Sequence, residues 1–322
     1  MWRKVILMAA VACLCAASAA YSFELQNPEC IAPAKPGGGH DNMCQLLAVS
    51  FSEALLGNMS IRYMPGGIGA LAYNHAVNVG KKNANLIIAA STGTVLNLAM
   101  GKFGEYSESD VRWLGAVATD YGVVAVRGDA PWHSLDDLVD ALKKEKENIV
   151  MGAAGSIGSQ DWMKMALIFD QAGLDPRQIR YIPYEGGGEA SSALMRGYIQ
   201  VFPGDISEVA GRLDSGKIRA LAVLADMRLP GKLSTIPTAV EQGYNVVWPV
   251  WRGYYLPPEI SNDEYQWWIN TLYRLESTKA FTREREKLQL FPLVRIGDTF
   301  EKYVRQNVRD LRAMARKFGL VR

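Results

Sequence analysis

Short apolar, β-branched runs alternate in the first third of the chain with longer segments whose apolar residues recur at helical spacing. The runs predict strands at 29–34, 60–64 and 85–90, and the longer segments predict helices at 43–56, 68–79 and 95–101. Strands that alternate with helices favour a parallel sheet with helices on its faces, so the pattern indicates an α/β fold. These elements would form one lobe.

A second series of alternating elements predicts another lobe. It begins with a β-rich passage at 113–127 and continues with helices at 135–147, 159–172, 189–196 and 206–214 and strands at 149–153, 180–183, 199–202 and 218–224. A return strand at 245–256 then precedes three helices, 264–275, 281–287 and 299–318, which we place on the first lobe. Two extended crossings, near 122–126 and 246–254, would join the lobes and form a hinge.

The predicted domains are a signal peptide at 1–22, a first lobe at 23–124 and 249–322, and a second lobe at 125–248. Arg3 and Lys4 precede an apolar stretch and then small residues at 17–20, which is typical of a cleaved secretory signal. The apolar stretch is shorter than the roughly 20 residues needed to span a bilayer, so a membrane anchor is the weaker interpretation. We therefore expect export.

Charge and composition exclude several classes of partner. Removing Arg3 and Lys4 with the signal leaves 33 basic residues against 33 acidic residues, so the mature chain is formally neutral. It offers no basic field that would attract nucleic acid or lipid head groups. Hydrophobic residues make up 49% of the chain, which is enough for a large core and excludes a disordered protein.

Two cysteines remain after the signal is removed, Cys30 and Cys44. In an oxidising compartment we expect a disulfide between them. It would join the first strand to the first helix, and in the entropic model it contributes about 3 kcal/mol for a closed loop of about 15 residues. Two free buried thiols are the alternative.

The stretch between these cysteines, CIAPAKPGGGHDNMC, predicts a strand that passes through a glycine turn into a helix. Gly37, Gly38 and Gly39 lack Cβ atoms, so the backbone can adopt positive φ and direct several N–H groups toward one point. Asp41 suits the N-cap of a helix that begins near Met43. The turn and the helix N-terminus would together hold a carboxylate or a phosphate. A simple strand-to-helix connection is the alternative.

Glycine and hydroxyl clusters recur where four other strands pass into helices. They are STGT at 91–94, GAAGSIGSQD at 152–161, YEGGGEA at 184–190 and FPGD at 202–205. The carboxyl ends of strands are where open α/β sheets bind ligands, so these turns and the first one would converge on one cleft. Helix capping is the alternative for each Ser or Thr, although Ser91 and Ser156 have glycine neighbours.

Competing chemistries each lack a required residue. Gly67, Gly69 and Ala72 spell GxGxxA, but the next strand ends without the acidic residue that would bind a ribose. Ser156 lies in a sequence near the nucleophile-elbow pattern, yet all three histidines precede it, against the hydrolase order. There is no GxxxxGK[ST] motif, and three scattered histidines offer no metal cluster. We therefore predict no cofactor and no metal.

Three passages carry a family resemblance: ECIAPAKPGGGHDNMC, YIPYEGGGEASSALMRGYIQ and LAVLADMRLPGKLSTIPTAVEQGYN. The chain resembles the extracytoplasmic solute-binding subunits of tripartite tricarboxylate transporters, the Bug-like receptors, and its PAKPGGG element is most similar to the citrate-binding branch. The resemblance implies a two-lobed periplasmic binding protein of the type II, Venus-flytrap kind. Such a protein closes on a small carboxylate, here citrate or another tricarboxylate, and presents it to a membrane permease.

The resemblance also implies a ligand site in which backbone amides, ordered waters and hydroxyls hold a carboxylate between the lobes. The matching positions are Gly38, Gly39, Asp41, Ser91, Thr92, Gly155, Ser156 and Ser159, with Gly187 and Asp205 as weaker candidates. His40 departs from the resemblance, because similar members carry a large aromatic or apolar residue there. A His40 cation would pair with a carboxylate, and binding would weaken as the pH rises past its pKa. A solvated or packed histidine is the alternative.

Other basic residues are candidates for a carboxylate partner or a docking surface. Lys35 would face the ligand or solvent, and Arg252 would face the ligand or form a salt bridge in the core or the hinge. The basic C-terminal helix is most simply a solvated face, with docking of the permease as the alternative.

The sequence therefore predicts a monomeric receptor rather than an enzyme. A sensor receptor that presents its ligand to a membrane kinase is one alternative, and a hydrolase on the same scaffold is another.

Overall fold

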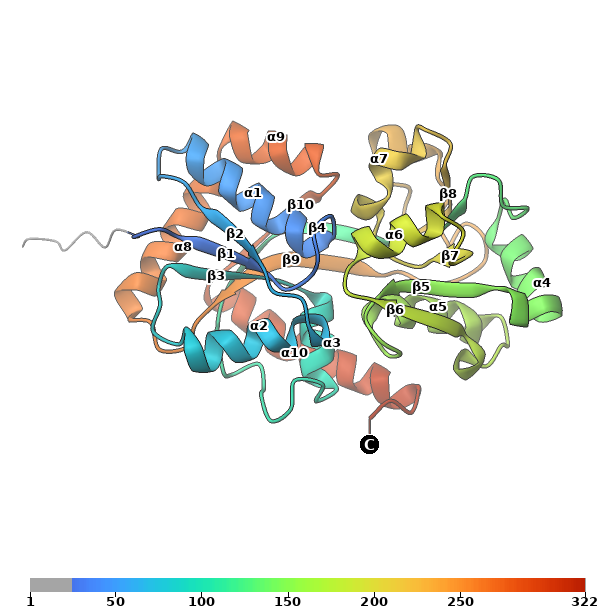
Figure 1. Cartoon of the computed structure of the whole chain (residues 1–322), viewed down its shortest axis with the longest axis horizontal. Helices are drawn as coiled ribbons and strands as arrows, with labels where there is room; N and C mark the ends of the chain where they lie inside the picture. Colours follow the sequence, from blue (N-terminus) through green and yellow to red (C-terminus); the bar gives the residue numbers. More distant parts are fainter. Residues whose placement is uncertain (1–24, 322) are drawn as a thin grey trace, which may run out of the picture.

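The computed structural model describes residues 25–321, and Figure 1 shows them as two halves side by side, each a β-sheet with helices packed on it. The predicted signal peptide at 1–22 lies outside the described residues. The α/β, two-lobed fold expected from the sequence is confirmed.

The first half is built on a sheet whose strands run in the order β2, β1, β3, β9 and β4, with β10 also paired to β4. Its strands are β1 (Glu29–Ala32), β2 (Ser60–Tyr63), β3 (Leu86–Ser91), β4 (Arg112–Arg127), β9 (Pro249–Leu256) and β10 (Phe291–Ile296). β1, β2 and β3 are parallel, whereas β9 and β10 run antiparallel to their neighbours. The sheet is therefore mixed, and the expected parallel arrangement holds only for its first three strands.

The second half continues from the same long strand. Its sheet contains β5 (Val150–Ala154), β6 (Arg180–Tyr184), β7 (Val201–Phe202) and β8 (Ile218–Leu224). β4 pairs with β9 as far as Tyr121 and with β8 from Gly122 onward, so one strand belongs to both sheets. Trp248 lies beside this junction, since its N–H donates to the Leu224 carbonyl and its carbonyl accepts from the Gly122 N–H. The two predicted crossings, 122–126 and 246–254, therefore lie next to each other.

Helices cover both sheets. The first half carries α1 (Gly39–Glu53), α2 (Ala70–Asn74), α3 (Thr92–Ala99), α8 (Asn262–Glu276), α9 (Lys279–Lys287) and α10 (Asp298–Lys317), and the second half carries α4 (Leu135–Glu145), α5 (Gln160–Gln171), α6 (Gly187–Met195) and α7 (Ala210–Leu213). The end of α10 reaches the second half, where Lys317 pairs with Asp170 on α5 at 2.7 Å. All six residues of β3 are buried, which explains its continuous apolar sequence.

The predicted disulfide is present. Cys30 on β1 and Cys44 on α1 are bonded, and both residues are fully buried. The bond holds the strand before the glycine turn to the helix after it, so it fixes both ends of the segment that enters the site.

Candidate functional site

The five turns singled out in the sequence meet at one cavity between the two halves. The cavity has a volume of about 40 Å³, and it is lined by residues that follow β1, β3, β5, β6 and β7, together with Arg252 of β9. An adjoining cavity of about 490 Å³ shares Ile68, Asn97 and Glu185 with it. The small cavity has room for only a few water molecules, whereas its neighbour would hold a small organic molecule.

Seven of the expected ligand-binding residues line the small cavity. They are Gly38, Gly39, His40, Ser91, Ser159, Gly187 and Asp205. Gly155 and Ser156 line the adjoining cavity instead. There the Ser156 hydroxyl accepts from Lys102 Nζ at 3.1 Å, so a lysine of the first half touches the second half.

Three expected residues line neither cavity. The Lys35 ammonium pairs with Glu189 at 2.8 Å, with both side chains well exposed. The Asp41 carboxylate accepts from the Gly37 N–H at 2.6 Å and from the Tyr63 hydroxyl at 2.9 Å. The Thr92 hydroxyl accepts from the Trp251 N–H at 3.1 Å. These side chains hold the walls of the site, because their polar atoms are bonded within the protein.

Helix α1 begins four residues earlier than predicted, which corrects the capping role given to Asp41. Gly38 is the N-cap residue, with φ −108° and ψ 178°, and it has no side chain to bond the first turn. Asp41 lies inside the first turn and reaches back to Gly37, which has φ +83°. Of the three glycines of the turn, only Gly37 adopts the positive φ that favours glycine. The N-terminus of the helix, which has no side-chain cap from its own segment, therefore faces the cavity.

A second helix N-terminus faces the first. Helix α6 begins at Gly187 after the N-cap Gly186, again without a side-chain cap. The two glycine turns touch, since a Cβ atom on Gly188 would lie 2.7 Å from the carbonyl carbon of Gly37. Two positive dipole ends from different halves thus converge at one point.

The Glu208 carboxyl group occupies the space between these helices. Its Oε1 accepts from the Gly39 N–H at 3.2 Å, and its Oε2 accepts from the Asp205 N–H at 3.1 Å. A Cβ atom on Gly187 would lie 2.0 Å from Oε1, so only glycine fits there. Burial raises the pKa of Glu208 to about 8, with further contributions from Asp205 and Asp161.

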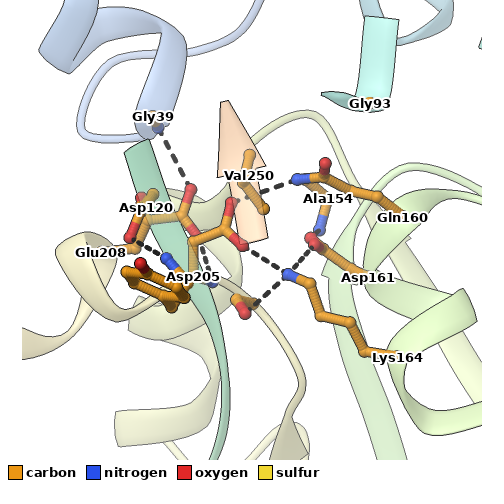
Figure 2. Close-up of polar contacts among 12 residues, drawn as sticks. Gly39, Gly93, Asp120, Ala154, Gln160, Asp161, Lys164, Asp205, Glu208 and Val250 are labelled. Carbon is orange, nitrogen blue, oxygen red and sulfur yellow. Dashed lines mark hydrogen bonds and ion pairs between the residues drawn. The ribbon is translucent and has the colours of Figure 1, made fainter. Parts of the chain in front are cut away.

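A buried ionic network supports the floor of the site (Figure 2). Arg252 donates to Asp120 at 2.8 Å and to Asp205 at 2.6 Å, and Lys164 bonds Asp161 at 2.8 Å as well as Asp205. All five side chains are almost completely buried. Because Asp205 is bonded to both cations, it is held rigidly beside the cavity.

His40 lies in the cavity wall with Nε2 3.5 Å from the Ser91 hydroxyl oxygen. Burial, together with the nearby charge of Arg252, lowers the pKa of His40 to about 3. The imidazole is therefore neutral at neutral pH. The hypothesis of a histidine cation that pairs with a carboxylate is not supported by this environment.

The model of the tripartite tricarboxylate transporter family receptor, TctC, matches residues 81–294. The chain belongs to this family. BugT of Bordetella pertussis is a curated relative of this TctC receptor, 25% identical over 246 residues that cover 73% of this chain and 71% of BugT.

Two solved structures share the fold of this TctC receptor. MatC from Rhodopseudomonas palustris with bound malate superposes with a TM-score of 0.79 and 18% identity, over 91% of this chain and 99% of MatC. A second R. palustris protein, with adipate, gives a TM-score of 0.80 and 20% identity, over 91% of this chain and 97% of that protein. The family is one of receptors rather than enzymes, in agreement with the expectation from the sequence.

In the described part of this TctC receptor, no helix is long and apolar enough to cross a membrane. The same residues contain no group of three or more His, Cys, Asp or Glu side chains that would hold a metal ion.

Sequence reasoning missed several residues of this site in the TctC receptor, among them Glu208, Lys164 and Lys102. Lys164 could have been recognised from the sequence, because this charged residue interrupts the apolar run WMKMALIF at 162–169. It follows Asp161 by three residues, a spacing that allows an ion pair on a helix. Glu208 could also have been recognised, since Asp205 and Glu208 have the spacing of a capping box. Lys102 is in a turn after α3, and nothing in the local sequence distinguishes it from a solvated lysine.

Proposed function

We propose that this TctC receptor captures a small carboxylate between its two lobes and delivers it to the membrane permease of a tripartite tricarboxylate transporter. The observation that carries the proposal is the meeting of two uncapped helix N-termini, α1 at Gly39 and α6 at Gly187, from opposite sides of one cavity. Backbone N–H groups at positive dipole ends are what a carboxylate requires, and a carboxyl group, that of Glu208, already accepts from the one at Gly39. Belonging to the TctC family supports the same ligand class.

One ligand carboxylate would lie between the glycine turns. Gly38, Gly39 and Gly187 would surround it, and the hydroxyl groups of Ser91 and Ser159 would hydrogen bond to it. His40 would face the ligand carboxylate as a neutral imidazole. Asp205, which bonds the buried cations Arg252 and Lys164, would hold the residues of the cavity floor in place. The small cavity accommodates no more than a carboxylate and its waters, so the rest of the ligand would extend into the adjoining cavity.

The adjoining cavity favours a ligand with more than one carboxylate. Lys102 lines it beside Gly155 and Ser156, and it donates to Ser156 and to the Ile157 carbonyl at 2.9 Å. It forms no ion pair within the described residues, and burial lowers its pKa. A cation that lines a cavity and has no acidic partner is available to pair with an anionic ligand. Citrate or a dicarboxylate therefore fits better than a monocarboxylate.

Closure of the lobes would trap this ligand. We propose that residues 23–124 and 249–322 move as one body and 125–248 as the other, with the junction of β4 at Tyr121 and Gly122 as the hinge. The two glycine turns lie on different lobes, so only the closed form presents both helix N-termini to the same carboxylate. The ligand thus favours closure through contacts that the open form lacks.

A binding screen tests the proposal. The mature protein is titrated with citrate, malate, adipate and acetate, and the uncharged adipamide serves as the control for shape. Stabilisation by a di- or tricarboxylate and none by adipamide is expected. If no carboxylate raises the melting temperature or gives a calorimetric signal, the proposed function is wrong.

A matched pair of lysine variants tests the role of the second cavity. Lys102→Gln should weaken binding of the best carboxylate by about tenfold, as expected for loss of a charge-assisted hydrogen bond to the ligand. Lys144→Gln, on the exposed surface of α4, should leave affinity unchanged. Equal affinities of the two variants would show that the ligand does not reach Lys102.

Delivery to the permease is tested separately, by uptake of the labelled ligand in cells with and without the receptor.

A further inference from the structure

The carboxyl group of Glu208 lies at the point where the proposed ligand carboxylate would bind. Its Oε1 accepts from the first N–H of α1, at Gly39, and it lies directly against Gly187 at the start of α6. Glu208 comes from the turn η5 (Ile206–Glu208), which belongs to the second half. A side chain of one half therefore binds the amide of the other half.

Capping of its own turn does not explain this position. The capping box uses Oε2, which accepts from the Asp205 N–H at 3.1 Å. Oε1 takes no part in the capping box. It accepts from the N–H of Gly39, a residue 169 positions away in the sequence. Glu208 forms no ion pair among the described residues, so its direct partners are the two backbone N–H groups, and the nearby charge of Arg252 also attracts it. The cradle made by the two helix N-termini is thus already filled by a carboxyl group.

The buried carboxylates around Glu208 make ionisation of its own carboxyl group unfavourable. Asp120, Asp161 and Asp205 are buried around the cavity floor against two cations, Arg252 and Lys164. An ionised Glu208 adds a fourth negative charge, and an incoming ligand carboxylate would add a fifth. Two carboxylates cannot share one amide cradle in a buried site, so one of them must leave or be protonated.

We propose that Glu208 is an internal competitor for the carboxylate cradle, and that the ligand's carboxylate takes the place of the ionised Glu208 side chain in the closed receptor. This inference rests on the proposed function. Glu208 then sets the affinity threshold of the receptor, because a ligand binds only if its contacts exceed those of Glu208 with the same amides. Weak or small carboxylates fail to displace it, whereas a ligand that also reaches Lys102 succeeds. Glu208 is in this sense a specificity-determining residue.

Competition of this kind depends on the ionisation of Glu208. The groups that face it are Asp205 on its own segment, Asp161 on α5, Arg252 on β9, Tyr181 on β6, and Arg212 on α7, which donates to the Glu208 backbone carbonyl. The pKa of Glu208 is raised to about 8, chiefly by burial. Above that pH the ionised group binds the amides more strongly and repels the ligand, so affinity falls as the pH rises from 7 to 9.

The experiment compares the wild type with Glu208→Gln, Glu208→Ala and a control, Asp214→Asn. Asp214 lies in the same half, is largely exposed and pairs with Lys232 on the surface. Calorimetry measures the affinity of each protein for citrate, malate and adipate at pH 7 and pH 9, and thermal unfolding checks that each variant is folded. Adipate and malate are fully ionised over this range, so their own charge does not change.

The proposal expects Glu208→Gln and Glu208→Ala to bind about tenfold tighter than the wild type at pH 9, with a smaller difference at pH 7. The wild type and Asp214→Asn should lose about tenfold in affinity between pH 7 and pH 9, whereas Glu208→Gln should not. Titration of Lys102 would affect every variant alike, so it cancels in this comparison. Binding by Glu208→Ala of a carboxylate that the wild type ignores would also support displacement.

Other outcomes overturn the proposal in distinguishable ways. If the folded Glu208 variants bind more weakly than the wild type, Glu208 holds the ligand rather than competes with it. If they bind equally at both pH values, Glu208 is only a structural cap. If Glu208→Ala fails to fold, Glu208→Gln decides, because it keeps the oxygen acceptor for Gly39. If no protein of the set binds any carboxylate, the proposed function itself fails.

Discussion

Arg252 Nη2 donates to Asp205 Oδ2 at 2.6 Å, and this bond joins an arginine of the first half to an aspartate of the second. The same nitrogen donates to Asp120 at 2.8 Å, near the point where β4 passes from one sheet to the other. Arg252 was expected to face either the ligand or a hinge salt bridge. In the structure Arg252 does both, because it lines the cavity and also forms the salt bridge between the halves.

Removing this arginine should destabilise the protein strongly. Arg252→Met leaves the buried Asp120 carboxylate without a cationic partner and Asp205 with Lys164 alone, so the free energy of unfolding should fall by about 3–5 kcal/mol. Arg228→Met is the control, because Arg228 pairs with Glu241 at the surface with both side chains about half exposed, and it should cost about 1 kcal/mol or less. Urea denaturation of both variants measures the two losses. Similar losses would contradict the structural role given to Arg252.

Gly39 should not tolerate even a methyl group. An added Cβ atom would lie 2.0 Å from Nη1 of Arg252, and the guanidinium is held by two carboxylates and cannot easily retreat. Gly39→Ala should therefore reduce the free energy of unfolding by about 1–3 kcal/mol and weaken carboxylate binding. Gly211→Ala, where no atom lies within 4 Å of the new Cβ, should be neutral or stabilise by up to about 1 kcal/mol. Tolerance of Gly39→Ala in both assays would show that the close contact is relaxed in solution.

Loss of the Cys30–Cys44 disulfide should weaken the glycine turn and the fold together. The double variant Cys30→Ser, Cys44→Ser should lose about 3 kcal/mol in free energy of unfolding on the entropic model. Wild-type protein unfolded in the presence of a reductant should reach the same value, which controls for the serine substitutions. A double variant as stable as the oxidised wild type would mean that the bond adds nothing to stability.

His40 should oppose folding at acid pH. Burial and the Arg252 charge lower its pKa to about 3, below the value of about 6.5 in the unfolded chain. Between these values the unfolded chain binds a proton that the folded protein does not, so the contribution of His40 falls as the pH drops below 6.5. Relative to His40→Gln, the wild type should lose up to about 1.4 kcal/mol per pH unit in that range.

Denaturant unfolding of the wild type and His40→Gln from pH 7 to pH 4.5 measures this difference. Asp161 and Glu208 titrate in both proteins, so their effects cancel in the comparison. A stability difference that does not change with pH would mean that the pKa of His40 is not lowered. Carboxylate affinity should also follow the same pH profile in both proteins from pH 5.5 to pH 8, because the imidazole stays neutral.

Local pattern predicted most of the elements. Strand β8 has the bounds expected from its apolar run, and the alternation of strands and helices predicted the class and the two lobes. The prediction was wrong where a tertiary contact overrides the pattern. Helix α1 begins at Gly39 because the Asp41 carboxylate bonds the Gly37 N–H, and β10 was missed because its half-exposed sequence FPLVRI contains a proline.

The sequence by itself determined the α/β class, the pair of cysteines that are bonded, and the glycine turns that enter the site, because each depends on residues close together in the chain. Only the tertiary structure decided which side chains face the cavity. Lys35, Asp41 and Thr92 bond within the walls, whereas Glu208 and Arg252 converge on Gly39 from strands and turns far away in the sequence. Burial and charge at that meeting point arise from contacts between segments, and no local pattern encodes them.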